Sequence, residues 1–119
     1  MSKPKIKVWG ITTCGTVRKA TAFLKANNVE FEFIDLKTTK PPKTLLKNAM
    51  KSVDAPGKMF NTSGGAYKDG GYKDKAATMS ANDIVDALAA EPMLIKRPIV
   101  VTEKGIAVGF DETILENII

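Results

Sequence analysis

The sequence contains no histidine and only one cysteine, Cys14. Without histidine, no mechanism can use imidazole as a base, and we expect no metal site because zinc ligands are mostly histidine and cysteine. A single cysteine cannot form an internal disulfide. Redox chemistry at Cys14 therefore needs a second thiol from another molecule.

Long apolar runs are also absent. No segment approaches the ~20 apolar residues that a membrane-spanning helix needs. The first residues, Met1–Lys5, lead into an apolar segment that is too short for a signal-peptide core. We therefore expect a cytoplasmic protein that does not contact a membrane.

Charge is distributed unevenly along the 119 residues, whose formal net charge is +5. Lysine and arginine predominate in residues 1–75, whereas acidic residues predominate in residues 76–119. A basic half can attract nucleic acid or an anionic substrate. The lysines are spread out rather than clustered, which favours a solvated surface, so we expect no direct binding of nucleic acid. The length fits a single domain over residues 1–119, expected to be a monomer.

The first part of the chain has the pattern of a strand, a helix and a second strand. Polar and apolar residues alternate over residues 5–9 and again over residues 30–36, as is typical of strands. Between them, from Gly15 to about Asn27, apolar residues recur at helical spacing, with Thr13 as a candidate N-cap. This order predicts a βαβ unit with parallel strands.

A mostly helical segment is expected over about residues 42–92. It opens at Pro41-Pro42, which suits a first helical turn, and it contains a glycine-rich, loop-rich stretch. Its last helix has Ser80 as predicted N-cap and ends before Pro92.

The pattern at the end of the chain predicts a β-hairpin followed by a helix. A short β-branched run at 99–102 and a second short strand at 106–110 flank a turn, and Asp111 is the predicted N-cap of the last helix. The complete order, βαβ–helical insert–ββα, is the thioredoxin-like arrangement. We therefore predict an α/β fold with a four-stranded mixed sheet flanked by helices.

Cys14 is the strongest candidate for chemistry. It lies where the first strand passes into the first helix, and a thiolate there faces unpaired N–H groups and the positive end of the helix dipole. Both favour the anion, so the pKa of Cys14 is expected below the usual value of about 8.5. The alternative is a buried cysteine that acts as a small hydrophobic residue.

Two arginines could assist this thiol. Arg18 follows Cys14 by one helical turn, where a guanidinium can stabilise a thiolate or hold an oxyanion. Arg97-Pro98 precedes the short strand at Ile99, at the point where thioredoxin-like folds place a cis-proline facing the cysteine. Arg97 would then direct its charge toward Cys14. The alternative for both arginines is an ordinary surface position.

Two segments resemble the arsenate reductase (ArsC)-like family. Residues 13–19, Thr-Cys-Gly-Thr-Val-Arg-Lys, resemble the nucleophile segment of the glutaredoxin-coupled arsenate reductases, and residues 93–101 resemble their second motif. Residues 61–64 and 108–110 resemble the Spx/MgsR and uncharacterised reductase-like branches. The resemblance extends from about Lys5 to Ile119.

The resemblance implies a mechanism in which Cys14 attacks the substrate, glutathione resolves the adduct and glutaredoxin restores the thiol. It implies no bound cofactor, with glutathione as co-substrate and glutaredoxin as partner. Three arginines surround the oxyanion in that family, and Arg97 matches one of them. Asn61 and Phe110 fall near the other two. Gly10 replaces a histidine that lies four residues before the nucleophile.

The resulting hypothesis is a thiol oxidoreductase that reduces arsenate or another substrate, with Cys14 and Arg97 as catalytic residues. The alternative is a Spx/MgsR-like regulator that binds the RNA polymerase α subunit. In that branch a second cysteine follows the first by three residues, a position that Val17 occupies here. Residues expected to stabilise the thiolate or contact the substrate are Arg18, Lys19, Thr13, Gly15, Asn61 and Pro98.

Overall fold

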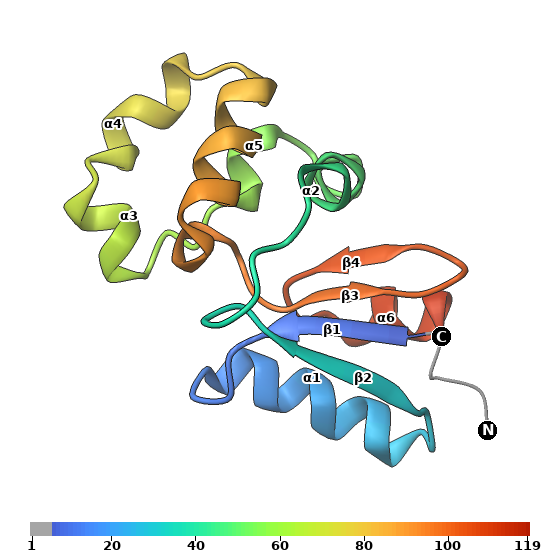
Figure 1. Ribbon diagram of the computed structural model, residues 1–119. Helices are drawn as coiled ribbons and strands as arrows, with labels where there is room; N and C mark the ends of the chain where they lie inside the picture. Colours follow the sequence, from blue (N-terminus) through green and yellow to red (C-terminus); the bar gives the residue numbers. More distant parts are fainter. Residues whose placement is uncertain (1–5) are drawn as a thin grey trace. The chain divides into compact units, whose positions relative to one another are not determined.

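The computed structural model describes residues 6–119, which form two compact units (Figure 1). One unit comprises the chain up to Leu36 together with Arg97–Ile119, and the other comprises Lys37–Lys96. The first five residues lie outside the described residues, and with them Lys5, which was expected in the first strand. None of the described helices is both long and apolar enough to cross a membrane.

The first unit contains a four-stranded sheet in the order β2-β1-β3-β4. Strand β1 (Ile6–Gly10) runs parallel to β2 (Phe31–Asp35), with Val8 opposite Phe33. It runs antiparallel to β3 (Ile99–Val101), which pairs with β4 (Ile106–Val108) in an antiparallel hairpin. The mixed sheet and the thioredoxin-like fold expected from the sequence are both confirmed.

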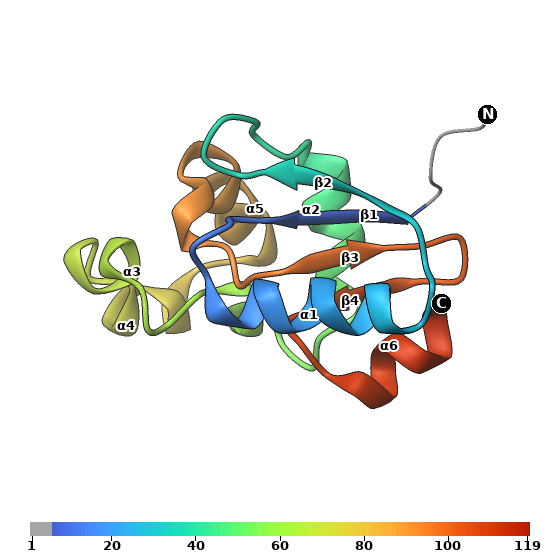
Figure 2. The same cartoon turned by 90° about the horizontal axis from the view of Figure 1, so that it is seen from below.

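Two helices of this unit cover the same face of the sheet. They are α1 (Gly15–Ala26) and α6 (Glu112–Ile118); in Figure 2 α1 crosses in front of the strands and α6 lies next to β4. Their apolar residues meet those of the strands because each helix carries one apolar stripe and each strand alternates its side chains between faces. The shared buried cluster consists of Val8, Ala20, Leu24, Val100, Ala107 and Leu115.

The ends of the two helices follow the sequence signals, with one exception. Asn27 is the C-cap of α1, and Asn28 adopts a left-handed φ of 57°. The side chain of Asp111 accepts a hydrogen bond from the N–H of Ile114 at 3.2 Å. The prediction of Thr13 as the N-cap of α1 is wrong, because the helix begins one residue later and Cys14 takes the N-cap position.

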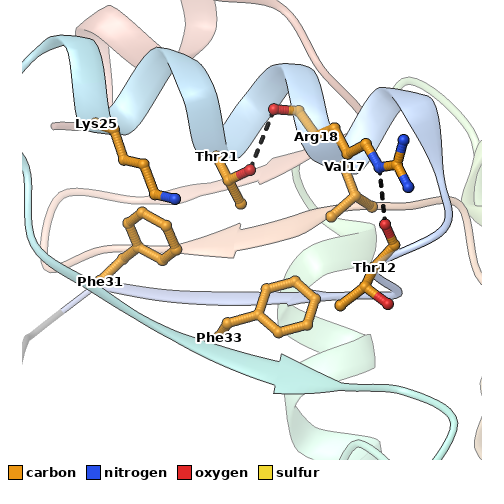
Figure 3. A pocket seen from close by; sticks show the side chains of 7 residues that line it. All are labelled: Thr12, Val17, Arg18, Thr21, Lys25, Phe31 and Phe33. Carbon is orange, nitrogen blue, oxygen red and sulfur yellow. Dashed lines mark hydrogen bonds between the residues drawn. The ribbon is translucent and has the colours of Figure 1, made fainter.

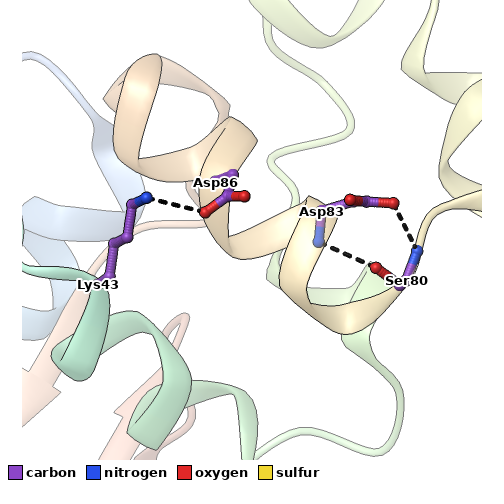
Figure 4. Close-up of polar contacts among 4 residues, drawn as sticks. All are labelled: Lys43, Ser80, Asp83 and Asp86. Carbon is purple, nitrogen blue, oxygen red and sulfur yellow. Dashed lines mark hydrogen bonds and ion pairs between the residues drawn. The ribbon is translucent and has the colours of Figure 1, made fainter.

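The second unit is the helical segment. Its helices are α2 (Lys43–Met50), α3 (Gly65–Asp69), α4 (Tyr72–Lys75) and α5 (Ala81–Ala90), with 3₁₀ turns at Pro56–Met59 (η1), Ala76–Thr78 (η2) and Pro92–Leu94 (η3). Helix α2 lies against α5. Ser80 and Asp83 form a reciprocal capping box at the start of α5, as Figure 4 shows. The cap predicted at Ser80 is therefore confirmed.

This unit is longer at both ends than the insert expected over about residues 42–92. Phe60 and Ile95 form an isolated antiparallel bridge, and the N–H of Lys96 donates to the carbonyl of Met59 at 2.8 Å. These contacts tie the chain up to Lys96 into the helical unit. Such a long-range bridge leaves no signal in the local sequence pattern.

Candidate active site

Cys14 lies in the loop that joins β1 to α1. Its backbone is extended, with φ −84° and ψ 123°, and its carbonyl accepts a hydrogen bond from the N–H of Arg18 at 3.1 Å. It is therefore the N-cap of α1, a position usually held by serine, threonine, aspartate or asparagine. Cys14 is partly exposed, so the buried hydrophobic alternative does not describe it.

The start of α1 approaches the end of β1 very closely. A β-carbon on Gly10 would lie 2.8 Å from Cγ2 of Val17, whose side chain is only 2% exposed. The carbonyl of Gly10 also accepts a hydrogen bond from the N–H of Leu36 at 2.9 Å. A residue without a side chain therefore packs best at position 10.

The pKa of the Cys14 thiol lies below its ordinary value. Partial burial raises this pKa. The backbone N–H groups of Val17 and Thr16 and the side chain of Arg97 together lower it by more than burial raises it. Thr16 and Val17 are the second and third residues of α1. The side chain of an N-cap residue faces the N–H groups at these two positions. The sulfur forms no capping hydrogen bond of full geometry, so these N–H groups act on it mainly as aligned dipoles.

Arg97 supplies a full positive charge to the same sulfur. It lowers the pKa of Cys14 through a hydrogen bond and through its charge. Its side chain is half-buried and its Nε atom is buried, which limits screening by water. The Arg97–Pro98 peptide bond is cis, and the carbonyl of Pro98 accepts a hydrogen bond from the N–H of Gly109 at 2.8 Å. The cis-proline expected at this point is therefore present.

The other arginine occupies a different place. Nε of Arg18 donates to the carbonyl of Thr12 at 3.0 Å, and its side chain lines a recess beside α1 (Figure 3). Arg18 is not among the described groups that shift the pKa of Cys14. The sequence suggested that both arginines contact the thiol. In the structure Arg97 contacts it and Arg18 does not.

The remaining predicted residues are distributed over both units. Thr13 and Lys19 are exposed, and Gly15 is the first residue of α1. Asn61 belongs to the Lys37–Lys96 unit, where its Oδ1 accepts a hydrogen bond from the hydroxyl of Ser63 at 3.1 Å. A role for these four residues in substrate binding stays a prediction.

The sequence predicted unpaired N–H groups near Cys14 without naming their residues, and the structure assigns them to Thr16 and Val17. Their side chains carry no signal, because any residue other than proline offers the same N–H at these helical positions. The signal that could have found them is the position of Cys14 as N-cap. Among residues 6–119, no group of three or more cysteine and acidic residues could hold a metal ion.

This arrangement can hold a thiolate and attract an anionic substrate. The helix start and a guanidinium both favour negative charge at one point, which is a requirement for a nucleophilic cysteine near neutral pH. The sequence has no histidine to act as base, and these surroundings favour the thiolate form of Cys14 instead. The resolving thiol must still come from outside the chain.

Comparison with known proteins finds relatives that match most of the chain. The chain is 38% identical to an uncharacterized protein, YusI, from Bacillus subtilis, over 87% of this chain and 89% of the relative. A crystal structure of a possible arsenate reductase from Streptococcus mutans superposes with a TM-score of 0.82 at 34% identity, covering 91% and 92% of the two chains. A Bacteroides fragilis protein related to the ArsC family gives a TM-score of 0.90 at 32% identity, covering 99% and 100%.

Regulators are also among the relatives. The global transcriptional regulator Spx from Lactiplantibacillus plantarum is 25% identical over 84% of this chain and 75% of the relative.

The model of the ArsC family matches residues 9–118, which include Cys14, Arg97 and nearly all of both units. The chain belongs to the ArsC family.

Proposed function

We propose that this protein is a single-cysteine thiol oxidoreductase in which Cys14 is the nucleophile and Arg97 binds both the thiolate and an anionic substrate. The observation that carries the proposal is the lowered pKa of Cys14, produced by the start of α1 and by the Arg97 guanidinium. A thiol whose pKa is lowered in this way is ionised at neutral pH to a greater extent than the thiol of a free cysteine.

Glutathione is the resolving thiol in this proposal. The Cys14 thiolate attacks the glutathione sulfur of a mixed disulfide, the original S–S bond breaks, and the substrate leaves as a thiol after taking up one proton. A second glutathione thiolate then attacks the Cys14–glutathione disulfide. Its products are glutathione disulfide and the Cys14 thiolate, and glutaredoxin can take the place of the second glutathione.

Reduction of arsenate follows the same use of two thiols. Arsenic(V) accepts two electrons and becomes arsenic(III), the two thiols give up these electrons as they join in a disulfide, and one arsenate oxygen leaves as water. Arg97, whose side chain interacts with Cys14, is the cation that binds the oxyanion in this proposal. Phe110, near one of the two unmatched arginine positions, stacks edge-on against Phe23 with ring centroids 6.2 Å apart and carries no charge.

Weak arsenate reduction is therefore expected. Each missing charge-assisted hydrogen bond costs roughly 1.5–3 kcal/mol, so the absence of two arginines lowers the rate with arsenate by orders of magnitude. A glutathione-linked disulfide, which develops less charge in the reaction, is the better substrate in this proposal.

A turnover assay tests the proposal. It would supply glutathione and glutaredoxin and compare arsenate with a small glutathione mixed disulfide, using the wild type, Cys14→Ser and Arg97→Gln. We expect turnover of the disulfide by the wild type, none by Cys14→Ser and slower turnover by Arg97→Gln. Equal rates for the wild type and Cys14→Ser on every substrate would refute the proposal.

A regulator that binds the RNA polymerase α subunit is the second candidate, supported by the similarity to Spx. Val17, whose side chain is buried, occupies the position of the second cysteine in that branch. Because Cys14 is the single cysteine of the sequence, no disulfide switch can form within this chain. Retention of the purified α C-terminal domain by both the wild type and Cys14→Ser, without turnover by either, would favour this candidate over the enzyme.

A further inference from the structure

A recess of about 240 Å³ lies beside α1, on the side of the edge strand β2 (Figure 3). Arg18, Thr21 and Lys25 follow one another at i, i+3 and i+7, so their side chains form one stripe along the helix. Phe31 and Phe33 are two residues apart on β2 and therefore face the same side of the sheet. The complete lining is Thr12, Val17, Arg18, Thr21, Lys25, Phe31 and Phe33.

The floor of this recess is apolar. Phe31 and Phe33 are half-buried, and their rings lie in a row beneath the helix in Figure 3. Val17, which is 2% exposed, forms a wall between the helix and the sheet. An occupant therefore needs an apolar segment to cover the exposed parts of the two rings.

A cation lies at each end of the row of rings. Figure 3 shows Arg18 beside Thr12 at one end and Lys25 beside Phe31 at the other. The two are seven residues apart, which corresponds to a rise of about 10 Å along a helix. Within residues 6–119, no carboxylate forms an ion pair with either side chain. Both charges are thus available to an anion.

The guanidinium of Arg18 is held in place while its terminal nitrogens stay available. Its Nε atom donates to the carbonyl of Thr12 at 3.0 Å, which fixes the orientation of the planar group at the end of the recess. A guanidinium oriented in this way can bind a carboxylate with two parallel hydrogen bonds.

The middle of the recess offers no hydrogen-bond donor. The hydroxyl of Thr21 donates its hydrogen to the carbonyl of Arg18 at 3.1 Å, so it presents its methyl group and oxygen lone pairs to an occupant. An anionic group placed there would be left unpaired next to two rings, which is costly. Negative charge is therefore favoured at the two ends and disfavoured between them.

We propose that this recess binds an elongated organic dianion, with an apolar middle and a carboxylate at each end. The volume lies below the ~300–1,000 Å³ of pockets for drug-sized ligands, which favours a short chain. The site is distinct from Cys14, which does not line it. The proposal does not depend on the redox function.

Binding is best measured with the Cys14→Ser protein, so that the result is separate from thiol chemistry. Suberate, an eight-carbon dicarboxylate, is compared with octanoate and octane-1,8-diol by NMR titration. We expect shifts at Thr21, Phe31 and Phe33, with suberate binding about fivefold more tightly than octanoate because it engages a second exposed cation. The neutral diol should bind more weakly than octanoate.

Charge variants complete the test. Arg18→Gln and Lys25→Gln should each weaken suberate binding about fivefold, to the level of octanoate. Lys104→Gln removes an exposed cation in the β3–β4 turn and should leave binding unchanged. The proposal is overturned if the diol binds as well as suberate, if Lys104→Gln weakens binding as much as Lys25→Gln, or if the shifts lie away from the recess.

Discussion

Val17 lies so close to Gly10 that a β-carbon at position 10 would stand 2.8 Å from Cγ2 and 3.0 Å from Cγ1 of the valine. The valine cannot yield easily, because it is β-branched and buried. Its own N–H is one of the groups that lower the pKa of Cys14. The packing between β1 and α1 therefore holds part of the environment of the thiol in place.

Gly10→Ala should lower the free energy of unfolding by about 1–3 kcal/mol, since the added methyl group overpacks a filled site. Chemical denaturation measures this effect. Gly15→Ala is the matched control, because a β-carbon there meets nothing within 4 Å and the position is helical. It should be neutral or should stabilise by about 0.4–1 kcal/mol. Equal losses in both variants would contradict this account of the packing.

The capping box of α5 gives a second prediction on stability. Ser80→Ala removes the oxygen that accepts the N–H of Asp83 at 3.1 Å, and it should cost about 0.5–2 kcal/mol in denaturant unfolding. Ser52→Ala serves as control, since Ser52 is exposed and its hydroxyl has no hydrogen bond among the described residues. No difference between the two variants would show that the cap does not stabilise the helix.

The nearby ion pair is expected to matter less. Nζ of Lys43 lies 2.9 Å from Oδ1 of Asp86, but both side chains are about 60% exposed, at 59% and 62% (Figure 4). Exposed pairs of this kind contribute about 0–1 kcal/mol. Lys43→Gln should therefore change the free energy of unfolding by less than Ser80→Ala does, and high salt should reduce the difference further.

Stability should depend on pH through Cys14. Its pKa is lower in the folded protein than in the unfolded chain, where it is about 8.5. The folded state thus binds fewer protons, and the resulting stabilisation is fully present above about pH 8.5 and is lost as pH falls through the folded pKa. The stability of the wild type relative to Cys14→Ser should accordingly rise with pH. A difference that is constant or falls with pH would contradict the lowered pKa.

The sequence predicts the sheet and its helices well, because local patterns determine them. Alternation over residues 5–9 and 30–36 and the helical spacing between them were sufficient for β1, α1 and β2. Ser80 and Asp111 marked the starts of their helices correctly, since a capping side chain acts within three residues of its own position. Thr13 failed as a cap because Cys14, one residue later, took that position.

The site was predicted only in part. Cys14 and Arg97 were identified from their positions at the start of α1 and before β3, and the structure joins them. Spacing also suggested Arg18, but whether a helical arginine turns toward the thiol or toward Thr12 depends on the conformation of the loop. The recess beside α1 depends on Phe31 and Phe33 facing that helix across the sheet edge, a tertiary relationship that no local pattern encodes.

The most direct test of the account is the pH dependence of Cys14 alkylation by iodoacetamide in the wild type, Arg97→Gln and Arg18→Gln. The account predicts a midpoint below about 8.5 in the wild type, a clear upward shift in Arg97→Gln and no comparable shift in Arg18→Gln, because Arg97 and not Arg18 lowers the pKa of Cys14. A wild-type midpoint at or above 8.5, or a midpoint that does not move when Arg97 is replaced, would contradict it.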